Sequence, residues 1–467
     1  MKKFLFPLVF LAGCNVGPDY VRPPVETPAA YKENSAELGW KPAEPRDAAA
    51  RGKWWAAFGD AQLDGLMAQL DAANQSIAVA EAQLRQATAL VAQSRAGWWP
   101  TLTGTIQDTR SKPSTTTGPV TGVPATKRVI YSAPLNASWE ADLWGKVRRA
   151  VESGEASEQA SASDLVNARL SVQTELAQNY FQLRALDSQR QLLDATVDAY
   201  AKTLDLTKNR YTVGVVSRAD VAQAETQLQS TRAQALDLRL QRAQLEHAIA
   251  VLLGKPASSF ALAAAPLAAV PPPVPAVGLP ADLLERRPDI ASAERKMAAA
   301  NAQIGVAKAA FFPAATIGAT YGVQSARPES WFTLPSRFWS LGPALALTIF
   351  DGGRRAPVSD QAVAAYDQSV ATYRGVVLTA FKEVEDNLAA LRILEEEAGV
   401  QAAAVKAAEQ SLEIALNQYK GGLITYLQVV QVQTATLANQ RAALDVSSRR
   451  IAASVLLVKA LGGGWGG

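Results

Sequence analysis

The chain carries the same helix–turn–helix signature twice, 208 residues apart. The first copy reads Arg210-Tyr211-Thr212-Val213-Gly214-Val215-Val216-Ser217, and the second reads Gln418-Tyr419-Lys420-Gly421-Gly422-Leu423-Ile424-Thr425. Both copies place a glycine, Gly214 or Gly422, where a helix needs a left-handed residue to end. Both then place a hydroxyl residue, Ser217 or Thr425, where the next helix needs a capping oxygen. Because long helical patterns flank each copy, we predict two helical hairpins, each with a defined tip.

The helix before each tip is long and free of proline. These helices run from about residue 144 to 211 and from about 354 to 419, so each would span roughly 100 Å at 1.5 Å per residue. Apolar residues such as Leu176, Leu183 and Leu186 return at the spacing of coiled coils. We therefore predict that the hairpins pack as coiled coils.

Alternating segments precede each long helix and predict β-strands. They fall at about 101–107 and 131–140 in the first half, and at about 316–324 and 339–349 in the second. A helical pattern precedes each strand pair, from about Ala61 to Ala96 and from about Asp289 to Phe312. An aromatic pair and a proline follow it: Trp98-Trp99-Pro100 and Phe311-Phe312-Pro313. The chain is therefore predicted to be a tandem duplication of helix, two strands, long helix, tip and helix.

These patterns divide the chain into six segments. We predict a lipoprotein signal peptide at 1–13, a lipidated extended segment at 14–60, a first repeat at 61–254, a Pro-rich equatorial linker at 255–288, a second repeat at 289–462 and a Gly-rich tail at 463–467. The first boundary rests on Leu11-Ala12-Gly13-Cys14, which follows two lysines and a short apolar run. It resembles a bacterial lipobox, whose cysteine is acylated, and two or more acyl chains give stable anchoring. The alternative is an ordinary secretory signal with a chance cysteine.

Composition argues against an enzyme. The chain has one Cys and one His and a net charge of +3. No Cys/His cluster can hold zinc, no serine has a plausible His–Asp partner set, and no phosphate-binding loop is present. The small net charge gives no support to nucleic-acid binding. We expect no catalytic residue, no metal site, no cofactor and no nucleic-acid partner.

Four strands cannot close a barrel, and open strand edges cannot sit in hydrocarbon. Strands must then come from several chains: two would give a narrow eight-stranded barrel, and three would give twelve strands and room for a lumen. We predict a mixed α/β membrane protein, a trimer whose twelve-stranded β-barrel continues into a long α-helical coiled-coil barrel. Trp98, Trp99, Phe311 and Phe312 would form an aromatic girdle at the membrane interface. Their alternative role is core packing.

The whole mature chain resembles an outer membrane factor of the TolC superfamily, in the lipoprotein branch typified by OprM and NodT-like efflux proteins. The resemblance rests on the lipobox, Trp54-Trp55-Ala56-Ala57-Phe58-Gly59-Asp60, both aromatic-aromatic-Pro junctions, both Tyr-x-x-Gly tips and the duplication. It implies an outer-membrane exit duct for drugs or other toxic small molecules, with a large periplasmic portion. The implied partners are two further copies of the chain, outer-membrane lipid, a periplasmic adaptor (membrane fusion protein) and an inner-membrane transporter, most often of the RND type.

The resemblance also implies a gate at the periplasmic tips. Tyr419 and Asp220 match a Tyr–Asp tie of the family, and Lys420 matches a basic residue of the lipoprotein branch. The alternative for Asp220 is a place in the first turn of its helix, favoured by the helix dipole. Gln428 and Gln431 stand where several family members have pore-facing aspartates, so we expect less cation preference here. The turns that would meet the adaptor are Val213-Gly214-Val215 and Gly421-Gly422-Leu423.

Two other interpretations stay open at this point. One shares the fold: an exit duct for a type I protein-secretion system, or for a metal or MFS-type efflux pump. The other is a periplasmic coiled-coil scaffold or adhesin without a channel. The four alternating segments argue against a scaffold, which needs no strands.

Overall fold

The computed structural model describes residues 15–25, 27–28, 31–32, 52–112, 114, 127–268, 283–284 and 286–463. The predicted signal peptide, Cys14, residues 269–282 and 285 of the predicted Pro-rich linker, and residues 464–467 of the Gly-rich tail lie outside these residues. The chain divides into two compact units. The strand unit comprises Met1–Pro24, Gln83–Ser161 and Ser292–Tyr373. The hairpin unit comprises Val25–Ala82, Ala162–Ala291 and Arg374–Gly467.

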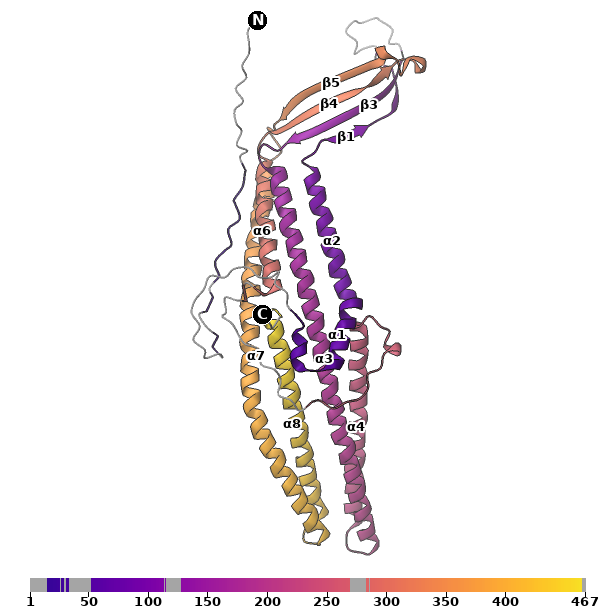
Figure 1. Ribbon diagram of the computed structural model, residues 1–467, viewed down its shortest axis with the longest axis vertical. Helices are drawn as coiled ribbons and strands as arrows, with labels where there is room; N and C mark the ends of the chain where they lie inside the picture. Colours follow the sequence, from indigo (N-terminus) through magenta and orange to yellow (C-terminus); the bar gives the residue numbers. More distant parts are fainter. Residues whose placement is uncertain are drawn as a thin grey trace. The chain divides into compact units, whose positions relative to one another are not determined.

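The strand unit is built on one antiparallel sheet (Figure 1). Its strands are β1 (Thr101–Gly104), β2 (Gln107–Ser111), β3 (Arg128–Ala141), β4 (Ala314–Ser325) and β5 (Arg337–Ala346). The order is β1–β3–β4–β5, and β2 also pairs with β3. Strands of the two sequence repeats therefore meet where β3 pairs with β4. At that seam Gly322 is required, because a Cβ there would lie 2.7 Å from the Cα of Pro134.

The first predicted strand is interrupted, and a proline on its neighbour explains the break. Both pieces keep one register on β3, with Gly104 opposite Leu135 and Gln107 opposite Ser132. Between them, the Thr105 N–H donates to the Pro134 carbonyl at 3.1 Å. Pro134 has no N–H with which to return the bond. β1 and β2 thus act as one strand position, and the prediction of four strands is confirmed.

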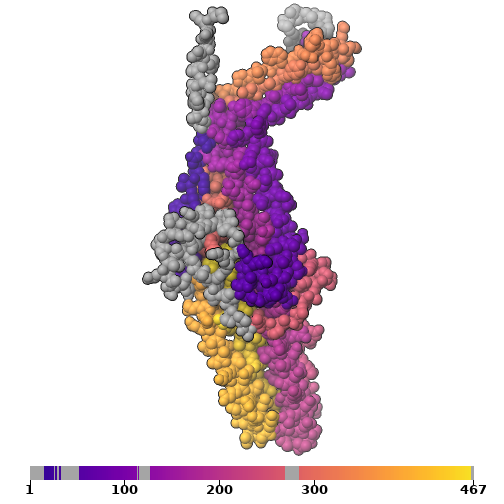
Figure 2. All heavy atoms as spheres, viewed as in Figure 1, coloured from indigo at the N-terminus to yellow at the C-terminus, as the bar shows by residue number. Residues whose placement is uncertain are grey.

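The two faces of the sheet differ in chemistry, as the alternation predicts. Leu135, Tyr321 and Trp339 are directly opposite one another on three neighbouring strands. Asn136, Thr320 and Ser340 form the adjacent row, which belongs to the other face because side chains alternate along a strand. Large exposed side chains on the apolar face are Leu102, Leu135, Ile317, Tyr321, Trp339, Leu341 and Leu345. Figure 2 shows β4 and β5 (orange) beside β3 (purple) at the surface.

The hairpin unit contains both tips and most of the two predicted hairpins, whose long helices begin within the residues of the strand unit. The first joins α3 (Lys146–Thr212) to α4 (Arg218–Leu252), and the second joins α7 (Arg355–Lys420) to α8 (Tyr426–Ala460). Both tips lie side by side at one end of the unit (Figure 1). α4 and α8 have the same length, and their bounds differ by the 208-residue offset of the sequence repeat. Leu176, Leu183 and Leu193 are fully buried, which agrees with their predicted packing role.

The other helices are α1 (Ala61–Ala73), α2 (Gln75–Ala96) and α6 (Pro288–Ala309). The single helix expected from Ala61 to Ala96 is wrong, because the backbone becomes extended at Asn74. The Asn74 side chain accepts from the Ile77 N–H at 3.0 Å and donates to the Leu252 carbonyl at 2.8 Å. Asn74 caps α2 and binds the end of α4. These buried hydrogen bonds stabilise the fold more than a continuous helix through this position would.

Glycines in left-handed conformation end all four hairpin helices. φ is +77° at both Gly214 and Gly422, +67° at Gly254 and +86° at Gly462. At the first tip, the Gly214 N–H donates to Tyr211 and the Val215 N–H donates to Arg210. This is the hydrogen-bond pair of a Schellman motif, and it explains why the tips could be found in the sequence.

We expect Gly254→Ala to destabilise the hairpin unit more than Gly214→Ala. A left-handed alanine costs about 1–2 kcal/mol at either position. At Gly254 the new Cβ would also lie 2.4 Å from the Ala73 carbonyl oxygen, whereas nothing lies within 4 Å at Gly214. Overpacking of that kind adds about 1–3 kcal/mol. Melting of the helical circular dichroism signal measures the difference, and equal losses for the two variants would contradict it.

Candidate channel surfaces and gate

The aromatic pairs at the helix-to-strand junctions are exposed in the chain. Trp98 and Trp99 are 52% and 74% exposed, and Phe311 and Phe312 are 43% and 41% exposed. Phe312 stacks on Trp144 with ring centroids 4.8 Å apart. These rings lie where the helices of the strand unit meet its sheet. Their contact with a membrane interface stays a prediction.

The segment that follows Cys14 is bound to the same junction. The Val16 N–H donates to the Trp144 carbonyl at 3.2 Å. Arg149, only 2% exposed, donates to the Asp19 carboxylate at 2.7 Å and to the Glu152 carboxylate at 2.8 Å. Burial lowers the pKa of Arg149, but these two carboxylates outweigh burial and raise its pKa above the ordinary value. The residues next to the predicted acylation site are therefore fixed to the strand unit.

Tyr419 lies in the core where the two tips pack together. It is 1% exposed and belongs to a cluster with Tyr200 and Leu204 of α3, Ala224 and Leu228 of α4, and Tyr426 and Val429 of α8. Its hydroxyl lies 3.2 Å from the Thr207 hydroxyl. Because Thr207 donates its own proton to the Thr203 carbonyl, Tyr419 is the donor in this pair. Burial, with Tyr419 and Tyr200 nearby, raises the pKa of Tyr426.

Asp220 does not contact Tyr419 within the chain. Its carboxylate accepts from the Ser217 N–H at 2.9 Å and from the Ser217 hydroxyl at 2.8 Å. Ser217 in turn accepts from the Asp220 N–H, which completes a capping box at the start of α4. Asp220 thus lies in the first turn of α4, which is the alternative role predicted for it from the helix dipole. A Tyr419–Asp220 tie would have to form between neighbouring chains and stays a prediction.

Arg210 also joins the two tips, and the sequence did not single it out as a gate residue. Its guanidinium carbon lies 4.7 Å from the centroid of the Tyr419 ring. Its Nη1 donates to the Tyr419 carbonyl. Arg210 therefore binds the last turn of α7 through both the ring and the backbone. The available signal was the difference between the two copies, since the second has Gln418 where the first has Arg210.

The remaining tip residues are exposed. Val213, Val215 and Leu423 are 72%, 60% and 78% exposed, and both turn glycines lie at the surface beside them. Lys420, Gln428 and Gln431 are also exposed. Gln428 accepts from the Thr425 N–H at 3.1 Å at the start of α8. The tips thus present apolar side chains and uncovered turn backbone.

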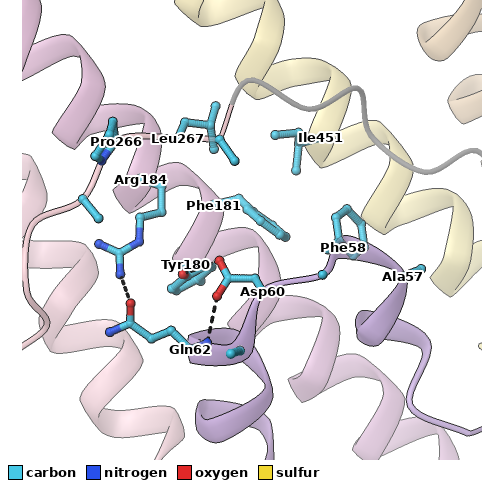
Figure 3. A pocket seen from close by; sticks show the side chains of 14 residues that line it. Ala57, Phe58, Asp60, Gln62, Tyr180, Phe181, Arg184, Pro266, Leu267 and Ile451 are labelled. Carbon is cyan, nitrogen blue, oxygen red and sulfur yellow. Dashed lines mark hydrogen bonds between the residues drawn. The ribbon is translucent and has the colours of Figure 1, made fainter.

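A cavity of about 460 Å³ lies in the hairpin unit, beside the start of α1 (Figure 3). Asp60 caps α1 there by accepting from the Gln62 and Leu63 N–H groups. The Tyr180 hydroxyl donates to Asp60 at 2.6 Å. Burial and this hydrogen bond raise the pKa of Tyr180 to about 12. The polar groups at the cavity wall are paired with one another, so the site is structural.

One protein-family model covers most of the chain. The model of the family described as "Outer membrane efflux protein" matches residues 66–255 and 279–463. The chain belongs to this family. Its two matches correspond to the two repeats, so the predicted duplication and the predicted TolC-like fold are confirmed.

Relatives and solved structures agree with the assignment to the outer membrane efflux proteins. The chain is 33% identical to the pyoverdine export outer membrane protein OpmQ of Pseudomonas aeruginosa, over 90% of this chain and 89% of OpmQ. It is 32% identical to the toluene efflux pump outer membrane protein TtgI of Pseudomonas putida, over 99% of this chain and 97% of TtgI. The outer-membrane channel OprN matches with a TM-score of 0.88 and 28% identity, over 97% of this chain and all of OprN. VceC of Vibrio cholerae matches with a TM-score of 0.80 and 30% identity, over 88% of this chain and 98% of VceC.

The protein is therefore an outer-membrane channel of an efflux pump, of the TolC-like kind that serves RND-type pumps. Its family is not enzymatic, as composition led us to expect. Among the described residues, no helix is long and apolar enough to cross a bilayer.

Proposed function

We propose that three copies of this chain form one exit duct, with four strand positions from each copy in a twelve-stranded barrel. The observation that carries the proposal is the sheet of the strand unit. Among the described residues, β5 pairs only with β4, and β1 and β2 pair only with β3. An apolar face and two unpaired edges in one sheet are compatible with hydrocarbon only when the edges are closed by other chains. The polar face, with Asn136, Thr320 and Ser340, would then line water.

The hairpin tips would form the gate at the periplasmic end of this duct. Arg210 and Thr207 of the first hairpin hold Tyr419 of the second through a carbonyl hydrogen bond, a cation–π contact and a hydroxyl pair. Such contacts are worth a few kcal/mol together, which suits a contact that must form and break. Lys420, Gln428 and Gln431 would lie at the constriction. The apolar turns at Val213–Val215 and 421–423 would receive a periplasmic adaptor, which couples the duct to an inner-membrane RND transporter.

The N-terminal segment would anchor the duct through acylated Cys14. The contacts of Val16 and Arg149 favour this, because they fix the chain next to Cys14 at the aromatic junction of the strand unit. Exported compounds would be drugs or other toxic small molecules. A type I protein-secretion or metal or MFS-type role remains the alternative.

Deletion of the gene tests this function. We expect hypersensitivity to several unrelated toxic compounds, restored by the wild-type gene. Cys14→Ala should restore resistance poorly because the acyl anchor is lost, whereas Asn15→Ala, a change at the next residue, should restore it fully. Minimum inhibitory concentrations compare the deletion strain with the three complemented strains. Unchanged susceptibility together with loss of an exported protein would replace drug efflux by protein secretion, and full complementation by Cys14→Ala would make the anchor dispensable.

A further inference from the structure

The hairpin tips carry an excess of positive charge. Within about five residues of the two loops, or one and a half helical turns, lie Lys208, Arg210, Arg218 and Lys420, against one carboxylate, Asp220. Lys208, Arg218 and Lys420 are exposed, and Arg210 is half-buried against Tyr419. The next carboxylates, Asp205, Glu225 and Glu413, lie farther from the loops along their helices. The positive band is therefore confined to the tip itself.

No carboxylate neutralises these cations in the part of the chain that the structure describes. Among the described residues, none of the four has a carboxylate oxygen within 4.0 Å of its charged nitrogen atoms. Asp220 is occupied by the N–H and hydroxyl of Ser217. Some cations farther from the tips do have carboxylate partners: Arg242 binds Asp187 at 2.7 Å, and Arg287 binds Asp289 at 2.6 Å. Direct ion pairs among the described residues therefore do not offset the charge of the four tip cations.

The neutral side chains of Gln428 and Gln431 add to the imbalance. Both are exposed on the first two turns of α8, where a carboxylate would offset Lys420. In the proposed trimer, each tip residue would occur three times around one opening. A band of one sign at a narrow opening concentrates ions of the other sign and repels its own.

We propose that the periplasmic tip makes this channel selective for anions, so that small organic anions pass more readily than cations of the same size. The inference rests on the proposed trimeric duct and names the charge class of its substrates. One unit charge about 10 Å from a permeating ion changes that ion's local concentration by about two-fold in water. Salt screens the effect over about 10 Å at 0.1 M, so the preference should be greatest at low ionic strength.

Reversal potentials in a potassium chloride gradient test the inference on the purified full-length protein in planar bilayers. We expect the wild-type chloride-to-potassium permeability ratio to exceed one. Lys420→Gln and Arg218→Gln should each lower it by at least about two-fold, because each substitution removes three charges from the proposed trimer and each charge acts oppositely on chloride and potassium. The double variant Gln428→Glu and Gln431→Glu should bring it below one. The control is Lys406→Gln, an exposed lysine on α7, about 20 Å along the helix from Lys420, which should leave the ratio unchanged.

A wild-type ratio at or below one, or a ratio that no tip variant changes, would overturn anion selectivity while leaving the duct intact. An equal effect of Lys406→Gln would also overturn it, because the selectivity would then not belong to the tip. Absence of currents from wild type and from the gate variant Arg210→Met would overturn the proposed duct itself, and the inference with it.

Discussion

Replacing Asp187 with alanine is expected to destabilise the hairpin unit by about 3–5 kcal/mol, as removal of one partner of a buried ion pair does. The Asp187 side chain is 3% exposed and accepts from Arg184 at 3.2 Å and from Arg242 at 2.7 Å. It also accepts from the Ala265 N–H at 3.1 Å. Alanine would leave two guanidinium groups and a backbone N–H without this partner in the interior.

The loss should also release the segment that leads into the Pro-rich linker. Arg242 donates to the Leu262 carbonyl at 2.6 Å, and Arg184 donates to the Ala263 carbonyl at 2.8 Å. Both arginines are oriented by Asp187, so this carboxylate links the segment to α3 and α4, with Glu246 as a second partner of Arg242 and of the Leu262 N–H. We expect a lower melting temperature by circular dichroism and faster proteolysis near residue 263.

The matched control is Asp194→Ala on the same helix. Asp194 is 58% exposed and pairs with Arg190 at 3.4 Å. An exposed pair of that kind contributes about 0–1 kcal/mol, so this variant should melt close to wild type. Equal melting temperatures for Asp187→Ala and Asp194→Ala would show that the buried network does not hold the unit together.

Features set by local rules could be predicted from the sequence. Gly214 and Gly422 end helices because only glycine takes a left-handed conformation at no steric cost. The two faces of β3, β4 and β5 followed from alternation, which needs no knowledge of the partner strand. The duplication followed from comparison of the chain with itself. These features explain why the family and the fold could be recognised.

Features that depend on residues distant in the sequence could not be predicted from the sequence. The break between β1 and β2 depends on Pro134, which pairs with Thr105 only once the sheet has formed. The end of α1 depends on a hydrogen bond from Asn74 to Leu252. The sequence also paired Tyr419 with Asp220, whereas within the chain Tyr419 contacts Thr207 and Arg210. Tertiary packing selects the partner of a side chain that could bond to several groups. The residue pattern within one strand or helix carries no information about that packing.

Replacing Arg210 with methionine is expected to open the proposed gate. Methionine keeps the apolar stem but removes the cation over the Tyr419 ring and the hydrogen bond to the Tyr419 carbonyl. A charged hydrogen bond contributes about 1.5–3 kcal/mol, and a cation–π contact about 0.5–2 kcal/mol, more as it is withdrawn from water. If the hairpins separate on opening, only the closed state has these contacts. Because 1.4 kcal/mol is a factor of ten, the ratio of open to closed channels should rise about ten-fold or more.

Two further variants separate the parts of this contact. Tyr419→Phe keeps the ring and the carbonyl but removes the hydroxyl that donates to Thr207, so it should shift the ratio by less than Arg210→Met. Arg218→Met removes an exposed cation at the first position of α4 that forms no ion pair among the described residues. It should leave the open-to-closed ratio unchanged.

Single-channel recording of wild type, Arg210→Met and Arg218→Met in the same planar bilayer tests the gated duct most directly. The account predicts a mostly closed wild type, an Arg218→Met variant with a similar open probability, and an Arg210→Met variant that is open about ten-fold more often. Equal open probabilities in wild type and Arg210→Met would contradict a gate held by the contact between the two tips.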